Sequence, residues 1–519
     1  MQPDLRIGID VGGTNTDAAV LDAHHRIVAR TKTPTTPDVT TGIRNALSDV
    51  TAQLGPDAER VRHVMLGTTH ATNAVVERHD LARTGVVRIG SPAGDSLPPT
   101  EGWPDDLRDA LLLDTCLIAG GNYIDGRPLR PLDHDALDRF LHRIAPHVQA
   151  LAITSVFAPS FPEHETEAAA RARAILGHAV PISLSHQIGA LGLLERENAT
   201  ILNAALHHVA SRVTDALTTA TGELGLNAQI HFVQNDGTLM DTARAARFPV
   251  LTIGSGPANS VRGAAVLSGI TDGIVADVGG TTTDLSVLVG GYPRQSTTGV
   301  TIGGIRLNSP MPDTLSIPIG GGTRIHSTGR GVRLGPDSLA HRINPQALAF
   351  GGTTLTLSDA AVHGARLSLG THTPAPDHAP LLEAALAAMD EQIQLAIENM
   401  ITSSTCQPLV LVGGAAPLIA RAIDGVSQVH TPPHSDIACA VGAASAHIGA
   451  STEHVLPSDD QLQDAIDALC DQVRLQAIEA GADPDATVIT HLAQTPMAYL
   501  TNPSVRLQIR AAGPLTAVA

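Results

Sequence analysis

Short apolar runs alternate with amphipathic stretches along most of the chain. Runs of Ile, Val and Leu bounded by Gly, Asp or Pro predict buried strands, and apolar residues at intervals of three and four predict helices. In the first part of the chain, the predicted strands are 5–9, 18–21, 61–66 and 151–156, and the predicted helices are 42–54, 71–78, 163–176 and 193–217.

The second part of the chain repeats this alternation. Its predicted strands are 230–234, 250–253, 273–276, 285–289 and 409–412, and its predicted helices are 256–269 and 381–399. The Gly-, Pro-, Ser- and Thr-rich stretch 290–358 holds too many Ile, Leu and Val residues for a linker, so we interpret it as short strands and binding loops. Strands at 497–500 and 505–509, with a helix before them, are predicted near the end of the chain.

These patterns predict an α/β fold, with a mixed sheet covered by helices in each of two similar lobes. We predict a first lobe at 1–195, a second lobe at 196–450 and a small α/β extension at 451–519.

One polar run occurs twice, almost letter for letter: Asp10-Val11-Gly12-Gly13-Thr14-Asn15-Thr16-Asp17 and Asp277-Val278-Gly279-Gly280-Thr281-Thr282-Thr283-Asp284. Each copy lies between two predicted strands and therefore predicts a hairpin. The glycines allow the backbone to approach a ligand closely, and the N–H groups with the Thr and Asn side chains suit phosphate oxygens. Ordinary turn chemistry explains one copy equally well, but it does not explain the repeated order of residues.

Each run opens with an aspartate at the end of a strand, Asp10 or Asp277. A carboxylate in that position suits Mg²⁺ held through its water molecules, because Mg²⁺ keeps much of its hydration shell and bridges to phosphates. Two such hairpins facing each other would hold the phosphates of one nucleotide from both sides. We therefore predict that Asp10 and Asp277 orient the metal and are the catalytic residues.

Composition narrows the function further. The net charge is −18 and aromatic residues make up 2% of the 519 residues, which argues against nucleic-acid binding. No apolar run approaches a membrane span and no basic-then-apolar leader begins the sequence, so we expect a cytoplasmic protein without a membrane partner. The four cysteines show no metal-binding spacing.

Lys32 is the only lysine of the chain. A Walker-type loop needs Gly-Lys-Ser/Thr and Schiff-base chemistry needs a positioned amine, so both are excluded. Phosphate chemistry must then depend on backbone amides, Thr, Arg and metal.

Several further stretches accompany the two runs: Leu66-Gly67-Thr68-Thr69-His70-Ala71-Thr72-Asn73-Ala74, Leu251-Thr252-Ile253-Gly254-Ser255-Gly256-Pro257-Ala258, Ile319-Gly320-Gly321-Gly322-Thr323-Arg324-Ile325 and Val412-Gly413-Gly414-Ala415-Ala416-Pro417. With them the chain resembles the hydantoinase A/oxoprolinase family of the actin, sugar-kinase and chaperone ATPase superfamily, over about residues 4–450. The resemblance implies a two-lobed actin-like ATPase fold, a duplicated ribonuclease H-like fold with a nucleotide cleft between the lobes. The chain is shorter than full-length A subunits, so it resembles the compact members.

The resemblance also implies an activity. Members of this family open cyclic amides such as 5-oxoproline, hydantoins or lactams with ATP and Mg²⁺, and the A-type subunit is thought to phosphorylate the amide oxygen. A hydantoinase B-like or other partner subunit then hydrolyses the activated ring. Phosphorylation is useful because resonance makes an amide a poor electrophile.

Individual site residues follow from the matching motifs. On one side of the phosphates the resemblance places Gly12, Gly13, Thr14, Asn15 and Thr16, and on the other Gly279, Gly280, Thr281, Thr282 and Thr283. It places Gly413, Gly414 and Ala415 against the adenosine, and an additional glycine loop, Gly320, Gly321, Gly322 and Thr323, beside the nucleotide.

Weaker signals concern the substrate. Thr68, Thr69 and Asn73 begin a predicted helix and suit either substrate or phosphate binding or simple N-capping. Asp236 stands where longer relatives tend to have Asn, which places a carboxylate near the cleft. Two other functions stay open from the sequence: a stand-alone small-molecule kinase, and an ATP-driven regulator or reactivating factor of another protein.

Overall fold

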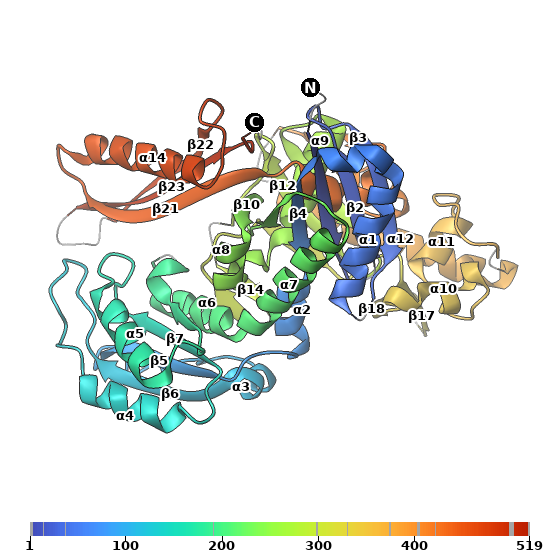
Figure 1. Ribbon diagram of the computed structural model, residues 1–519. Helices are drawn as coiled ribbons and strands as arrows, with labels where there is room; N and C mark the ends of the chain where they lie inside the picture. The colour runs from blue at the N-terminus through green and yellow to red at the C-terminus, as the bar shows by residue number, and fades with distance from the viewer. Residues whose placement is uncertain are drawn as a thin grey trace.

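The computed structural model describes residues 4–516 apart from 14, 37, 190, 297–298, 330, 373–374, 402–404, 421 and 498–502. It contains two large sheets, a smaller parallel sheet and helices packed on their faces (Figure 1). Among these residues, no helix combines the length and the apolar character needed to cross a membrane.

The largest sheet has nine strands in the order β22-β23-β21-β10-β9-β4-β1-β2-β3. Strands β1, β2 and β3 are antiparallel neighbours, whereas β1, β4 and β9 run parallel. Helices α1 (Val39–Leu54) and α7 (His207–Glu223) pack together on one face. The strands are β1 (Leu5–Val11), β2 (Asn15–Leu21), β3 (Ile27–Pro34), β4 (Val61–Thr68), β9 (Gln229–Val233), β10 (Thr238–Asp241), β21 (His447–Pro457), β22 (Val488–Pro496) and β23 (Ser504–Gly513).

The second sheet repeats the central arrangement of the first. Its order is β13-β12-β11-β19-β20, with β16 also paired to β12. The hairpin strands are again antiparallel and the next two strands again parallel, which matches β3-β2-β1-β4-β9 position by position. This duplication confirms the two-lobed, actin-like α/β fold predicted from the sequence. The strands are β11 (Gly273–Val278), β12 (Thr283–Val289), β13 (Tyr292–Pro293), β16 (Thr314–Ile317), β19 (Gln407–Val412) and β20 (Val426–His430).

A parallel sheet of order β6-β5-β7-β8 is inserted between β4 and β9 and lies at the lower left in Figure 1. One face packs against α4 and α5, and the other against α3 and α6. The elements are β5 (Thr84–Ser91), α3 (Asp105–Leu111), β6 (Leu112–Ala119), α4 (His134–Ile144), β7 (Ala150–Ser155), α5 (Glu163–Leu176), β8 (Ile182–Leu184) and α6 (Leu193–Ala205).

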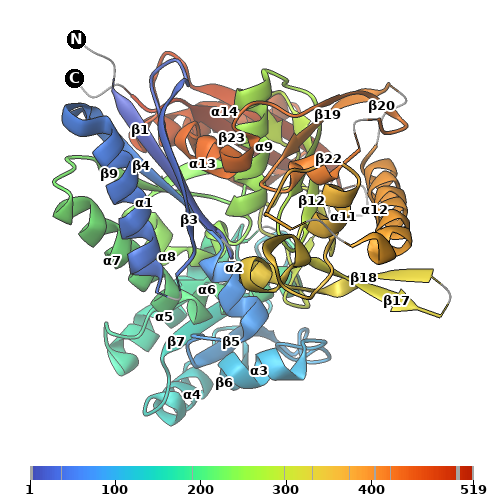
Figure 2. The same ribbon diagram turned by 90° about the vertical axis from the view of Figure 1, so that its right-hand side faces the viewer.

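Two helices, α9 (Ser255–Ser268) and α13 (Ala438–Ala444), connect the lobes and pack against each other (Figure 2). Helix α13 lies on the first sheet and α9 on the second. Their contact is close because glycine removes the Cβ: on Gly263 a Cβ would stand 1.9 Å from the Ala438 oxygen, and on Gly442 1.9 Å from the Asn259 oxygen. Both helices therefore approach the strand ends that carry the repeated runs.

The remaining elements connect or extend these layers. The hairpin β17–β18 projects from the second lobe in Figure 2. The other helices and strands are α2 (His70–Glu77), α8 (Thr242–Arg247), α10 (Ile343–Gln346), α11 (Leu357–His363), α12 (Ala379–Met400), α14 (Leu462–Glu479), β14 (Val300–Ile302), β15 (Ile305–Leu307), β17 (Thr323–Thr328) and β18 (Gly331–Ser338). Short 3₁₀ helices are η1 (Gly55–Arg60), η2 (Ser185–Gln187), η3 (Pro249–Thr252), η4 (Ala340–Arg342), η5 (Leu348–Phe350), η6 (Pro376–His378), η7 (Ala416–Leu418) and η8 (Ser435–Ile437).

The single helix predicted at 193–217 is wrong, because the chain breaks at Leu206 into α6 and α7. The Ala205 carbonyl accepts a hydrogen bond from the Ala82 amide at 2.8 Å. This carbonyl therefore has a hydrogen-bond partner outside the helix. The spacing of apolar residues continues across the break, which is why the sequence pattern predicted a single helix.

The strand predicted at 250–253 is also wrong, since residues 250–252 belong to the 3₁₀ helix η3, which begins at Pro249. Pro249 cannot donate a backbone hydrogen bond. Asn235 provides the partners instead: its backbone N–H donates to the Leu251 oxygen at 2.6 Å, and its side-chain Nδ2 donates to the Val250 oxygen at 3.0 Å.

Near the C-terminus, Met497 is the one described residue of the strand predicted at 497–500, and it directly follows β22, which ends at Pro496. Residues 498–500 lie outside the described part of the chain. The predicted division at 195 and 450 stays a prediction. The largest sheet contains strands from both sides of position 195, and β21 itself spans position 450. Beyond β4 the sheet continues in one direction through β9, β10, β21, β23 and β22.

Candidate functional site

The repeated runs form two hairpin turns with the same geometry. The Gly12 amide donates to the Asn15 oxygen at 3.0 Å, and the Gly279 amide donates to the Thr282 oxygen at 2.9 Å. Gly13 and Thr281, at the tips of the turns, are exposed. Thr14 lies outside the described residues.

Pairing in each hairpin sets two carboxylates side by side. Asp10 is opposite Asp17, and Asp277 is opposite Asp284. Directly opposed residues of an antiparallel pair share one face of the sheet. The sequence analysis used only the first aspartate of each run, although the second could have been found by counting the register of the hairpin.

Asp10 is almost buried, and its Oδ1 has no hydrogen-bond partner within the described residues. Burial raises the pKa of Asp10 to about 7, with further repulsion from Asp17 and Asp277 and partial compensation from Asn259 and Lys32. The carboxylates of the two hairpins are thus close enough to repel each other. A cation in this cleft would relieve that repulsion.

The only lysine joins the two lobes at this cleft. Lys32 Nζ donates to Asp17 Oδ2 at 2.8 Å and to the backbone oxygen of Asp436 at 2.9 Å. Burial raises the pKa of Asp17 to about 6 against the opposing charge of Lys32. Burial acts to lower the pKa of Lys32, but Asp17 and Asp436 outweigh it and hold that pKa above its ordinary value.

Asp277 is contacted by residues of α9 and α13. Ser260 Oγ donates a short hydrogen bond to Asp277 Oδ2, and the Cys439 thiol lies 3.5 Å from the same oxygen. Burial raises the pKa of Cys439 well above its ordinary value, followed by the charges of Asp277 and Asp10. This thiol is therefore neutral and sits among the carboxylates of both hairpins.

Asp284 completes the second pair. Burial raises the pKa of Asp284 to about 6, Ser316 acts against this rise, and Asp277 adds to it. No lysine is among the groups that shift the pKa of Asp284.

The glycine loop at 320–322 packs against the second hairpin. The amides of Gly321 and Gly322 donate to the oxygens of Gly279 and Gly280 at 3.0 and 2.7 Å. A Cβ on Gly320 would stand 2.6 Å from the Thr281 nitrogen. Next to the loop, Thr323 Oγ1 accepts a hydrogen bond from the Gly320 amide.

The turn at 413–415 also packs on this hairpin, next to the glycine loop, since a Cβ on Gly321 would stand 3.5 Å from Ala415 Cβ. The Ala415 amide donates to the Val278 oxygen at 2.9 Å. Gly413 has φ of 89°, and a Cβ there would stand 2.3 Å from Asp277 Oδ1, so glycine is needed for both reasons. Gly414 faces the first lobe, because a Cβ on it would stand 3.9 Å from Lys32 Cε.

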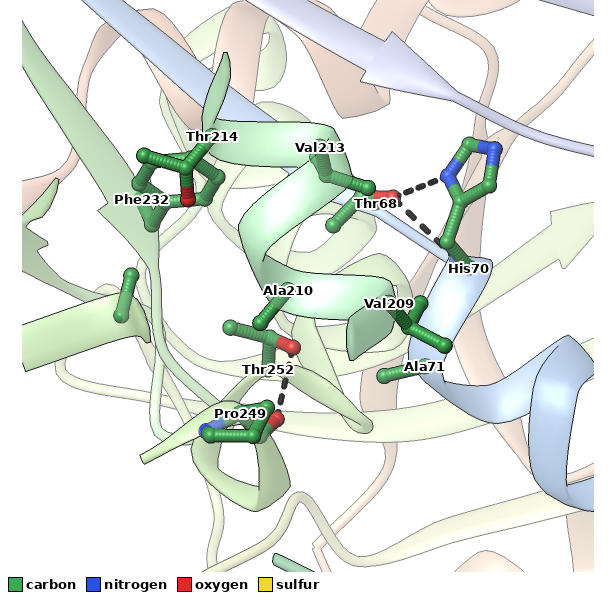
Figure 3. Close-up of a pocket in the computed structure, with 11 residues that line it drawn as sticks. Thr68, His70, Ala71, Val209, Ala210, Val213, Thr214, Phe232, Pro249 and Thr252 are labelled. Carbon is green, nitrogen blue, oxygen red and sulfur yellow. Dashed lines mark hydrogen bonds between the residues drawn. The ribbon is translucent and has the colours of Figure 1, made fainter. Parts of the chain in front are cut away.

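The substrate candidates at the start of α2 differ in what they contact. Thr69 is the N-cap residue but makes no side-chain capping bond; its Oγ1 donates to the Val11 oxygen of the first hairpin at 2.9 Å. Thr68 and His70 contact each other and line a cavity of about 20 Å³ behind β4 (Figure 3). That volume suits roughly one water molecule and is too small for a cyclic amide. Asn73 lies in α2 and is half-buried.

Asp236 has a structural partner. Its Oδ1 accepts hydrogen bonds from the amide and from Oγ1 of Thr238 at 3.0 and 2.6 Å, which closes the turn between β9 and β10. The substrate role predicted for Asp236 stays a prediction.

The residues present fit a hydrated metal ion better than a directly bound one. No group of three or more His, Cys, Asp or Glu side chains arranged to hold a metal occurs in the described part of the chain. Two carboxylate oxygens, Asp10 Oδ1 and Asp17 Oδ1, are nevertheless buried without a partner. Water molecules and phosphates would have to supply the remaining ligands, as is usual for Mg²⁺.

Comparison with known proteins agrees with this arrangement of motifs. The model of the hydantoinase/oxoprolinase N-terminal region matches residues 6–176, and that of hydantoinase/oxoprolinase matches residues 196–379. The chain belongs to the hydantoinase/oxoprolinase family. The resemblance predicted from the sequence is therefore confirmed.

Two curated relatives of this family member carry the names of enzyme subunits. It is 31% identical to the caprolactamase subunit alpha of Pseudomonas jessenii over 68% of this chain and 53% of that protein. It is 26% identical to the acetophenone carboxylase gamma subunit of Aromatoleum aromaticum over 84% of this chain and 67% of that protein. The chain thus spans about half the length of the caprolactamase subunit that it matches.

The fold is shared with a solved member of the family. The crystal structure of ATP-dependent caprolactamase from Pseudomonas jessenii superposes with a TM-score of 0.74 at 22% identity, over 99% of this chain and 89% of that chain. At this identity the likeness concerns the fold alone.

Proposed function

We propose that this hydantoinase/oxoprolinase family member binds ATP·Mg²⁺ between its lobes and phosphorylates the amide oxygen of a cyclic amide. The observation that supports it most directly is the meeting of Asp10 and Asp277, from equivalent strands of the two lobes, close enough for each charge to affect the other. Their hairpins have the same turn geometry, so one phosphate chain can be held from both sides.

Each part of the site has a role in this proposal. The turns at Gly12–Thr16 and Gly279–Thr283 hold phosphate oxygens with their N–H and hydroxyl groups. Asp10 and Asp277 orient the waters of Mg²⁺, which neutralises phosphate charge when bound. Gly413, Gly414 and Ala415 lie against the adenosine, and the loop at Gly320–Thr323 stiffens the second hairpin beside it.

The reaction transfers the γ-phosphoryl group of ATP to the carbonyl oxygen of the ring amide and releases ADP. Water then adds to the activated carbon, and the C–N bond breaks as the ring nitrogen takes up a proton and leaves as an amine, which gives an acyl phosphate. A second water molecule hydrolyses the acyl phosphate to the carboxylate and free phosphate. Because phosphoryl transfer depends mostly on positioning and charge neutralisation, it needs no covalent nucleophile from this chain. The similarity to an ATP-dependent caprolactamase supports a ring amide as the substrate class.

A partner subunit is part of the proposal, as is a cytoplasmic location. The two curated relatives described above are named as subunits alpha and gamma, which supports assembly with another chain. Such a partner would hydrolyse the phosphorylated ring.

The test is ADP release by the purified chain, with and without the protein encoded beside it, over a panel of lactams, hydantoins and 5-oxoproline. Turnover stimulated by a ring substrate and dependent on the partner is expected. Phosphoryl transfer to a hydroxyl compound by the chain alone would indicate a small-molecule kinase instead. Turnover stimulated only by a client protein would indicate an ATP-driven regulator.

A further inference from the structure

Helix α9 presents two consecutive polar residues to the carboxylates of the two hairpins. Ser260 Oγ donates a hydrogen bond to Asp277 Oδ2 of the second hairpin. Asn259 lies beside Asp10 of the first hairpin: Asn259 Nδ2 and Asp10 Oδ1 stand 2.0 and 2.9 Å from the point that a Cβ on Gly67 would occupy. One helix therefore touches the metal-facing carboxylate of each lobe.

Ordinary packing does not explain Asn259. Its side chain is 0% exposed, and neither its oxygen nor its nitrogen makes a hydrogen bond of ordinary geometry within the described residues. Its amide lies near enough to Asp10 to act against the rise in the pKa of that carboxyl. A buried amide without partners destabilises a fold, so an apolar side chain of the same size would be the better choice for stability alone. Asp10 Oδ1, next to it, is equally unpartnered.

The strands beside Asp10 and Asp277 are arranged in a similar way in the two lobes. Asp10 pairs in register with Gly67 of β4, and Asp277 lies against Gly413, which directly follows β19. Strands β4 and β19 occupy the same position in their sheets. Each carboxylate therefore lies between one residue of α9 and a glycine that is in the neighbouring strand or directly follows it.

We propose that Asn259 and Ser260 are positioning residues, each of which orients the carboxylate of one hairpin toward the hydrated Mg²⁺ of a bound nucleotide. This inference rests on the nucleotide-binding part of the proposed function and does not depend on the ring substrate. Since both residues belong to one helix, α9 sets the two carboxylates relative to each other.

The first test is Ser260→Ala, with ADP affinity measured by calorimetry in Mg²⁺ and again in EDTA. Loss of a hydrogen bond to a carboxylate should weaken binding about tenfold in Mg²⁺ and leave the affinity in EDTA unchanged. A residue that only supports the fold would change both affinities alike. Ser268→Ala is the matched control, because Ser268 lies at the far end of α9 and donates to the Ala264 oxygen.

The second test is Asn259→Leu, which keeps the branching and the number of heavy atoms of the side chain and removes both polar atoms. The thermal midpoint of the nucleotide-free protein should rise, while the Mg²⁺-dependent ADP affinity falls about tenfold. A lower midpoint with wild-type affinity would make Asn259 a structural residue and overturn its part of the proposal. Wild-type affinity in Ser260→Ala would overturn the part of Ser260.

The two levels of the argument fail separately. Wild-type protein that binds ADP·Mg²⁺ but shows no ring-stimulated turnover would contradict the proposed function only. Wild-type protein that binds no nucleotide with Mg²⁺ would overturn both.

Discussion

The first and second hairpins have the same turn and are supported by different groups. Side chains support the first one: Thr35 Oγ1 donates to the Gly12 oxygen at 2.8 Å, and Thr69 Oγ1 donates to the Val11 oxygen. The second one is supported mainly by backbone, since Gly321 and Gly322 donate to it through their amides, and Ser338 Oγ adds a longer bond to the Gly280 oxygen at 3.3 Å. The duplicated fold has kept the turn and replaced its surroundings.

The charges near the two hairpins differ in the same way. Lys32 compensates Asp17 in the first lobe, whereas Ser316 opposes the rise in the pKa of Asp284 in the second. The first hairpin therefore holds a charge pair that reaches across to Asp436, and the second holds a carboxylate stabilised only by neutral groups. We expect substitutions that remove a charge to affect the first lobe more strongly. We expect substitutions that add a side chain close to the backbone to affect the second lobe more strongly.

The largest effect should come from removing either metal-facing carboxylate. Asp10→Asn and Asp277→Asn should each lower turnover by at least about a hundredfold, because charge stabilisation at the transferring phosphoryl group is lost. The fold should survive, which circular dichroism and thermal unfolding would check. Near wild-type turnover in one variant would show that the two lobes are not equivalent and would remove that carboxylate from the metal-orienting role.

The second prediction concerns the backbone support of the second hairpin. Gly320→Ala places a methyl group 2.6 Å from the Thr281 nitrogen and should lower the free energy of unfolding by roughly 2 kcal/mol. Thr35→Val, in the first lobe, removes one hydroxyl and should lower it by about 1 kcal/mol. Urea unfolding measures both.

Gly329→Ala serves as the control for this comparison, since a Cβ there meets nothing within 4 Å. Equal losses in Gly320→Ala and Gly329→Ala would mean that the loop does not support the hairpin.

The lobes and their hairpins could be predicted because the information is local. The order Asp-Val-Gly-Gly-Thr between two apolar runs identifies a turn without any knowledge of distant contacts. The break between α6 and α7 could not be predicted, since it depends on the Ala82 amide reaching the Ala205 oxygen from another part of the chain. The same holds for η3, whose backbone partners are supplied by Asn235.

In the candidate site, Asp17 and Asp284 were missed although the register of each hairpin identifies them, and the other missed residues are brought in by tertiary contacts. Ser260, Asn259 and Cys439 reach the cleft only because α9 and α13 pack between the lobes. Lys32 carried a signal, since it is the only lysine of the chain, but its partners Asp17 and Asp436 come from different parts of the sequence.

A third prediction compares the hairpins by pH. Because the pKa of Asp10 is raised to about 7, the folded, metal-free protein keeps a proton that the unfolded chain has released. Stability should therefore fall as the pH rises, by roughly 2 kcal/mol more in the wild type than in Asp10→Asn between about pH 5 and pH 8. For Asp284, with a pKa of about 6, the loss of stability in the wild type relative to Asp284→Asn should be smaller, and it should end at a lower pH. Denaturant unfolding across this pH range measures both, and parallel curves for the wild type and Asp10→Asn would contradict the raised pKa.

The smallest effect, and the one most specific to the first lobe, concerns Lys32 and Asp17. Lys32→Met leaves the Asp17 carboxylate without its cation, and Asp17→Asn leaves the lysine without its anion. The double variant removes both charges, so the double-mutant cycle should give a coupling of about 1 kcal/mol in the free energy of unfolding. Arg30→Met is the matched control on the same strand, because the ion pair of Arg30 with Asp436 is nearly half exposed on both sides and should contribute little. A coupling near zero for Lys32 and Asp17 would mean that solvent already screens their contact, and the charge difference between the two hairpins would then lose its energetic basis.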